Sequence, residues 1–220
     1  MGYNKRKQKL FKERQKTTQK GGHILNTGQI TEMICILDKS GSMYGKESDT
    51  IGSFNQMLKE QKDQPGEAYI TTALFSDCCR VLYRHTPVQK AEELTEATYF
   101  TGGNTALFDA IGEVINEADQ VISGTGNNSQ PKILVFIITD GMENASRHYD
   151  LHTIRKLIQE KQSNGWEFLF FGTDMETLEL AQSAGIKKKN TLQYTRDSKG
   201  IHTGYQTAGQ RFSQMRRQTK

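Results

Sequence analysis

Short apolar runs and longer stretches with helical spacing follow one another along the first half of the chain. The run 33–37 is apolar at every position and predicts a strand that is buried on both faces. Apolar residues recur at helical spacing over 51–58 and predict a helix. The segments 69–75 and 80–83 are separated by a short polar turn, which favours an antiparallel hairpin.

The second half of the chain continues this alternation of helix and strand. The apolar positions after Ala106 define one face of a long helix, and Asp150 is typical of an N-cap. Gly165 is expected to end the helix that Asp150 begins. The remaining elements that the pattern predicts are strands over 133–138, 166–171 and 191–194, a short helix over 178–184, and a C-terminal helix from about Tyr205.

Strands that alternate with helices predict an α/β fold of the doubly wound, Rossmann-like class. We expect a mostly parallel central sheet with one antiparallel edge strand, and helices on both faces. Residues 23–220 are interpreted as a single domain whose core spans about 29–195, with a helical extension after it. In such sheets ligands bind beyond the carboxyl ends of the strands.

Composition is ordinary for a globular domain, with 35% hydrophobic and 25% charged residues. No stretch approaches the roughly 20 apolar residues that a membrane span needs, and no apolar segment typical of a secretory signal follows the first charges. The three cysteines, two of them adjacent, indicate neither a disulfide framework nor a zinc site. We therefore expect a cytoplasmic protein that makes no membrane contact.

Positive charge is concentrated at the N-terminus. Residues 1–22 hold eight Lys or Arg and one acidic residue, a net charge of +7, while the remaining residues carry −3. A basic arm of this kind is typical of a solvated, flexible terminus. The alternative is that the arm contacts a nucleic acid or an acidic protein.

Oxygen-bearing side chains follow the two most strand-like segments and precede the long helix. Because the carboxyl ends of neighbouring parallel strands lie at one edge of a sheet, these side chains are expected to converge. Each segment alone is typical of a turn or a helix cap, and only their joint occurrence indicates a site. Oxygen ligands suit hard cations, Mg²⁺ above all, with Mn²⁺ or Ca²⁺ as alternatives. The candidate metal ligands are Asp38, Ser40, Ser42, Thr105 and Asp140.

This set of residues resembles the complete metal-ion-dependent adhesion site of a von Willebrand factor A (vWA) domain. The similarity includes Asp38-x-Ser40-x-Ser42, Thr105 after Gly-Gly-Asn, and Asp140 in Thr-Asp-Gly, and it covers about residues 29–195. The resemblance implies that the three hydroxyls bind the ion, and that the two aspartates act directly or through water.

The resemblance also implies a non-catalytic module that binds a protein partner. An ion held largely by neutral hydroxyls keeps positive charge, so its free position favours an Asp or Glu carboxylate of a protein ligand. Cytoplasmic members of this family in bacteria commonly work in multi-component systems, which makes a bacterial complex the expected setting.

Two other classes of function compete with this interpretation. A Mg²⁺-dependent hydrolase would use Asp38 as a phosphoryl acceptor, but Ser40 stands where such enzymes usually carry a further acid. The phosphate-binding pattern GxxxxGK[ST] is also absent. A nucleic-acid-associated protein would bind through residues 1–22, and its binding would weaken with salt.

Overall fold

A single six-stranded sheet forms the centre of the protein. A computed structural model describes residues 30–125 and 131–217, so the basic arm 1–22 and part of the loop after the long helix lie outside the described residues. The strand order is β3-β2-β1-β4-β5-β6, and only the β2–β3 pair is antiparallel. The strands are β1 (Thr31–Asp38), β2 (Ala68–Phe75), β3 (Cys79–Pro87), β4 (Lys132–Ile138), β5 (Glu167–Gly172) and β6 (Thr191–Gln193).

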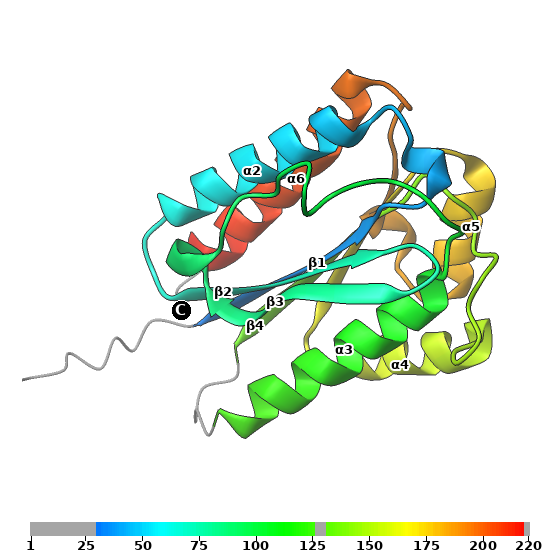
Figure 1. The fold of residues 1–220 in the computed structure, drawn as a ribbon. Coiled ribbons are helices and arrows are strands. Elements are labelled where there is room, and N and C mark those ends of the chain that lie inside the picture. Colours follow the sequence, from blue (N-terminus) through cyan, green and yellow to red (C-terminus); the bar gives the residue numbers. More distant parts are fainter. Residues whose placement is uncertain (1–29, 126–130, 218–220) are drawn as a thin grey trace, which may run out of the picture.

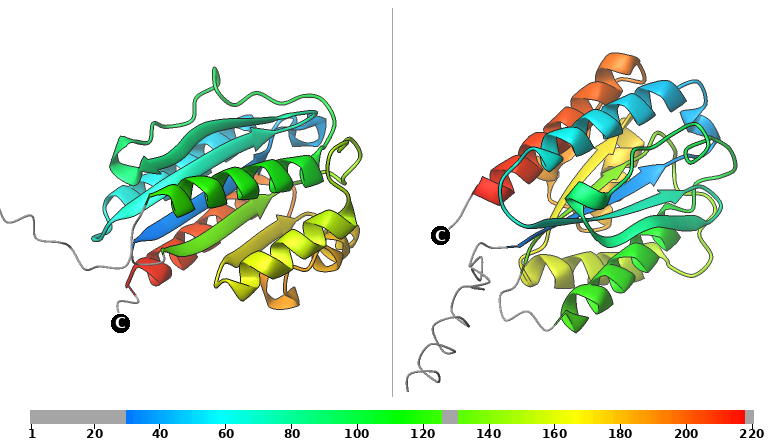
Figure 2. Two further views of the ribbon diagram at one scale, coloured as in Figure 1. Left: turned by 90° about the horizontal axis from the view of Figure 1, so that it is seen from below. Right: turned by 60° about the vertical axis from the view of Figure 1, so that its left-hand side comes forward.

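Helices cover both faces of the sheet (Figures 1 and 2). The helices α2 and α6 pack on one face, and α3, α4 and α5 pack on the other. This arrangement confirms the predicted doubly wound fold with one antiparallel edge strand. The helices are α2 (Glu47–Lys62), α3 (Leu107–Gly124), α4 (Leu151–Ser163), α5 (Met175–Ser183) and α6 (Ser198–Arg217), with 3-10 turns at η1 (Gly41–Met43), η2 (Val88–Lys90) and η3 (Lys188–Asn190).

The two central strands place the candidate ligands side by side. All eight residues of β1 are buried, because β2 and β4 flank it and helices cover both of its faces. The β1–β4 register pairs Leu37 with Ile138, so Asp38 lies beside Thr139 at the same edge. Asp140 follows at once, which sets both aspartates at the carboxyl edge of the sheet.

The C-terminal helix begins at Ser198, so the predicted start near Tyr205 is wrong. Asp197 accepts a hydrogen bond from the backbone N–H of Gly200 at 2.8 Å and thereby caps the first turn, a local interaction that apolar periodicity does not register. The helix packs closely on the sheet at Gly204, where an added β-carbon would lie 3.4 Å from Phe171. Its residues Tyr205 and Phe212 are fully buried in the core.

No helix in the described part of the chain is long and apolar enough to cross a membrane.

Candidate metal centre

Three loops meet at the carboxyl edge of the sheet. The first follows β1 and contains η1, the second precedes α3, and the third follows β4. Backbone hydrogen bonds join the first two loops: the Gly41 N–H donates to the Gly103 carbonyl at 2.9 Å, and the Gly102 N–H donates to the Lys39 carbonyl at 2.8 Å. The third loop is joined to the second through the Asn144 N–H and the Thr105 carbonyl, 3.0 Å apart.

The three predicted hydroxyl ligands converge in front of Gly141. The Ser40 and Ser42 hydroxyl oxygens are 2.9 Å apart. A β-carbon placed on Gly141 would lie 2.5 Å from Thr105 Oγ1, 3.0 Å from Ser42 Oγ and 3.4 Å from Ser40 Oγ. Glycine is therefore the residue that leaves the space between these oxygens open.

Asp38 holds the first loop in place through hydrogen bonds. Its side chain is fully buried, with Oδ1 accepting from the Ser40 N–H at 2.6 Å and Oδ2 accepting from the Thr139 hydroxyl at 2.6 Å. Burial raises the pKa of the Asp38 carboxyl, and the hydrogen bonds from Thr139 and Ser40 only partly oppose that rise. Because both oxygens already have donors, Asp38 is suited to position the serine loop and a bound water.

Asp140 attracts positive charge in this structure. Its Oδ1 accepts from the Thr173 hydroxyl at 2.7 Å and lies 2.8 Å from Arg196 Nε. The Lys46 ammonium contacts Oδ2 of the same carboxylate and also the backbone carbonyl of Ser42. Two side-chain cations thus contact this one carboxylate.

These observations test whether the residues present fit a divalent cation. Oxygen donors surround a space that a β-carbon would fill, and the adjoining carboxylate already holds cations. Within residues 30–125 and 131–217 no group of three or more His, Cys, Asp or Glu side chains could hold a metal. A metal at this edge would therefore depend on the hydroxyls, and such a donor set fits a hard cation.

The sequence profile of the von Willebrand factor type A domain matches residues 32–206. The chain belongs to this family. The match extends into α6, past the end near residue 195 that the sequence motifs indicated. No curated protein sequence matches the chain.

Solved structures of other proteins share the fold of this vWA domain. Proximal thread matrix protein 1 from the mussel byssus is similar with a TM-score of 0.61 and 12% identity over 84% of this chain and 47% of that protein. A second structure of that protein, described as having a zinc-occupied MIDAS motif, has a TM-score of 0.60 and 17% identity over 82% and 47%. A von Willebrand factor type A protein from Catenulispora acidiphila has a TM-score of 0.57 and 14% identity over 84% and 43%. The chain thus spans about half the length of these proteins.

Several residues around the site of this vWA domain were not predicted from the sequence. Lys46 and Arg196 carried no motif, and their contacts with Asp140 arise only when α2 and the segment before α6 pack beside β4. Asp109, in the first turn of α3, was not predicted to have a role. Its carboxylate accepts hydrogen bonds from three successive backbone N–H groups of the loop after β4, those of Arg147, His148 and Tyr149.

Exposed apolar side chains surround the same edge of the domain. The large hydrophobic residues that are exposed in the described part are Tyr44, Phe100, Met142 and Met175, at 82%, 55%, 39% and 59%. Tyr44 follows η1, and Met142 follows Gly141. Lys39 Nζ lies 4.8 Å from the centre of the Phe100 ring. Met142 Sδ accepts a hydrogen bond, at 3.4 Å, from Thr177 in α5, the helix that Met175 begins.

Proposed function

We propose that this vWA domain is a non-catalytic binding module that holds one divalent cation and presents it to a protein partner. The proposed ligands are Ser40, Ser42 and Thr105, with Asp38 and Asp140 acting directly or through water. The observation that carries the proposal is the convergence of three hydroxyls on the open side of Gly141, beside a carboxylate that already attracts cations. Mg²⁺ is the proposed ion, with Mn²⁺ or Ca²⁺ as alternatives.

Electrostatics favours an anionic partner group. Neutral hydroxyls cancel none of the ion's charge, and the two carboxylates at most balance it. Both carboxylate oxygens of Asp38 already accept hydrogen bonds from the protein. Lys46 and Arg196 add positive charge beside Asp140. A partner Asp or Glu that enters this partly desolvated setting gains more from a charge-assisted bond than it would in water.

The exposed apolar side chains around the metal centre, Tyr44, Phe100, Met142 and Met175, support a protein as the partner. Aromatic residues and Met are enriched where protein interfaces are buried, and four such side chains lie around this edge. A partner segment with an acidic side chain flanked by apolar residues could bind the ion through its carboxylate and pack its apolar residues against these exposed side chains. We propose that residues 23–220 act as one unit in the cytoplasm, within a bacterial complex, without catalysing a reaction.

Nucleic-acid binding through residues 1–22 remains the alternative proposal. The supporting feature is the net charge of +7 in that segment. Binding to RNA or DNA that weakens steeply with salt, and that is lost when these residues are deleted, would favour it.

Affinity capture tests the proposed function. The wild-type domain is immobilised with Mg²⁺ or with EDTA, and Asp140→Ala is immobilised with Mg²⁺. The matched control is Asp63→Ala, because Asp63 is an exposed aspartate at the far end of α2. We expect a partner that binds wild type and Asp63→Ala in Mg²⁺ and is lost in the other two arms. Replacing the partner's contacting Asp or Glu should abolish the complex, and a partner that is retained in all arms contradicts the mechanism.

A further inference from the structure

A buried tyrosine supports the loop that carries the proposed serine ligands. Asp38 is fully buried, and its carboxylate already accepts hydrogen bonds from Ser40 and Thr139. Its main-chain carbonyl also accepts one, from the hydroxyl of Tyr99 at 2.6 Å. Ser40 lies two residues further along the chain. The Tyr99 hydroxyl therefore holds the end of β1 from which the ligand loop begins.

Tyr99 lies in a segment that is itself fixed in place. The segment runs between η2 and α3 and is attached to α2 at two points (Figure 1). The Asn55 side chain donates to the Leu94 carbonyl at 2.9 Å and accepts from the Leu94 N–H at 2.7 Å. The Thr101 hydroxyl donates to the Glu47 carboxylate. Tyr99 is thus held between two anchors, and its ring packs in the core beneath α2 and α6.

The Tyr99 hydroxyl is suited to act as a permanent donor. Its side chain is 1% exposed, and burial raises the pKa of the hydroxyl well above its ordinary value. The hydroxyl therefore stays protonated near neutral pH. Tyr205 of α6 is equally buried, but its hydroxyl has no hydrogen-bond partner within residues 30–125 and 131–217. Of these two neighbouring tyrosines, Tyr99 is the one that holds the metal-bearing loop.

The position of this loop decides which ion it can bind. Mg²⁺ needs oxygen ligands at about 2.0–2.1 Å in a nearly perfect octahedron, whereas Ca²⁺ accepts about six to eight oxygens at about 2.3–2.6 Å in flexible arrangements. A loop that moves by roughly 0.3 Å therefore loses its fit to Mg²⁺ and still suits Ca²⁺. A group that holds the loop still favours the smaller ion.

We propose that Tyr99 is a positioning residue of the metal centre, and that its hydroxyl, by holding the Asp38 carbonyl, makes the centre select Mg²⁺ over Ca²⁺. The inference rests on the proposed metal-binding function. Tyr99 acts on the ion through the backbone of Asp38. Without the hydroxyl, the buried carbonyl loses a donor, and the end of β1 gains freedom to move in search of another.

Titration of Tyr99→Phe with Mg²⁺ and with Ca²⁺ tests the proposal, because phenylalanine keeps the ring and removes only the hydroxyl. We expect wild type to bind Mg²⁺ more tightly than Ca²⁺. In Tyr99→Phe the Mg²⁺ affinity should fall by about tenfold, as when a group that orients a ligand is removed, and the Ca²⁺ affinity by less than about twofold. A role in folding alone would lower the melting temperature in EDTA and leave the ratio of the two affinities unchanged.

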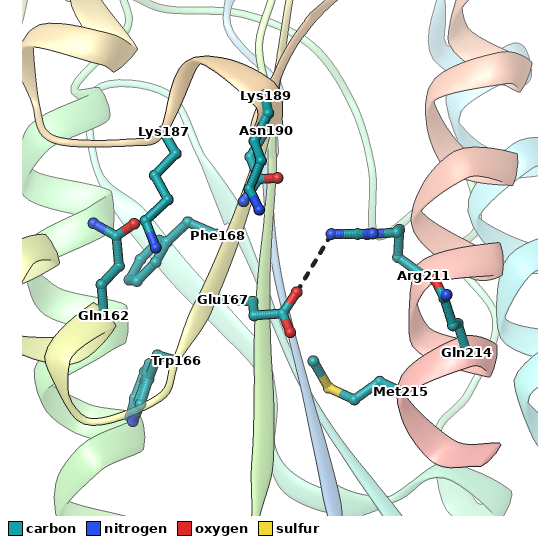
Figure 3. Close-up of a pocket in the computed structure, with 10 residues that line it drawn as sticks. All are labelled: Gln162, Trp166, Glu167, Phe168, Lys187, Lys189, Asn190, Arg211, Gln214 and Met215. Carbon is teal, nitrogen blue, oxygen red and sulfur yellow. Dashed lines mark hydrogen bonds and ion pairs between the residues drawn. The ribbon is translucent and has the colours of Figure 1, made fainter. Parts of the chain in front are cut away.

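Two matched variants separate the effect on the ion from effects on the fold. Tyr205→Phe makes the same chemical change at an equally buried tyrosine whose hydroxyl is unpartnered in the described part of the chain. Gln162→Met removes another side-chain hydrogen bond to a backbone carbonyl, that of Gly185 at 2.9 Å. Gln162 lines a cleft of about 290 Å³ near the start of β5, toward the opposite end of the strands from the metal centre (Figure 3). Both variants should keep the wild-type ratio of Mg²⁺ to Ca²⁺ affinity.

The outcomes that contradict the role of Tyr99 differ from those that contradict the metal centre. Equal affinity of wild type for the two ions would overturn the proposal, even if Tyr99→Phe fails to fold. An equal loss of both affinities in Tyr99→Phe, no loss of either, or the same change of ratio in Tyr205→Phe would also overturn it. Wild type that binds neither ion would instead refute the proposed metal centre, and the role of Tyr99 with it.

Discussion

Replacing Gly141 with alanine adds one methyl group at the point where the three hydroxyls converge. The new carbon would lie 2.5 Å from Thr105 Oγ1 and 3.0 Å from Ser42 Oγ, whereas an ordinary contact is at least 3.4 Å. The threonine hydroxyl must therefore move by about 0.9 Å, or the loop that carries it must move with it. The Thr105 carbonyl accepts from the Asn144 N–H, which restrains that loop.

The geometry sets the expected size of the effect. Over-packing a tight site costs about 1–3 kcal/mol of folding free energy, and the domain should remain folded. Mg²⁺ demands oxygen ligands at about 2.0–2.1 Å in nearly ideal octahedral geometry, so a hydroxyl displaced by about 0.9 Å no longer serves as a ligand. We expect Mg²⁺ affinity to fall by at least about 10–100-fold, as when groups that orient a ligand are removed.

Calorimetric titration with Mg²⁺ and Mn²⁺, together with melting curves in EDTA, measures both effects. Gly52→Ala is the matched control, because Gly52 is an exposed position in α2 where an added β-carbon would meet nothing within 4 Å. That change should raise stability by up to about 1 kcal/mol through helix propensity and leave metal affinity unchanged. Wild-type metal affinity in Gly141→Ala would refute the placement of the ion between these hydroxyls, and so would an equal loss in both variants.

Four further predictions follow from charged groups in the protein. Lys46→Met removes a cation that competes for Asp140, so calorimetry should show metal affinity rising by about tenfold, and unchanged affinity would contradict the competition. Metal affinity should fall as the pH is lowered, because the raised pKa of Asp38 means that protons compete with the metal at higher pH than they would at an ordinary aspartate; an affinity independent of pH would contradict this. In EDTA the same carboxyl favours folding only while protonated, so its contribution is lost as the pH rises through that raised pKa, and a melting temperature independent of pH would contradict this. His85→Ala should cost about 3 kcal/mol in urea unfolding, because it leaves the fully buried Glu32 carboxylate without the imidazole 2.7 Å away, and the double change with Glu32→Gln should recover part of that loss.

Apolar patterning was sufficient to predict the architecture and the region of the site. Parallel strands that are buried on both faces are continuous apolar runs. The two longest predicted runs of this kind, 33–37 and 133–138, lie in the central strands β1 and β4. Since the polar residue that follows such a strand lies at its carboxyl edge, the positions of Asp38 and Asp140 followed from their place in the chain. The hydroxyls of the two intervening loops could be expected near them for the same reason, and they meet at Gly141.

Features that depend on packing between distant segments were not predictable in this way. Lys46 reaches Asp140 across 94 positions of sequence, and no local pattern marks such a pair. The early start of α6 depends on a side-chain cap at Asp197, which apolar spacing does not reveal.

A crystal structure of the domain grown with Mn²⁺ tests the central claim most directly, because the anomalous signal of the metal locates it without assumptions about its ligands. The account predicts a single strong peak within about 2.3 Å of the Ser40, Ser42 and Thr105 hydroxyl oxygens, with the Lys46 ammonium withdrawn from Asp140. A peak elsewhere on the protein, or none at this edge at saturating Mn²⁺, would contradict it.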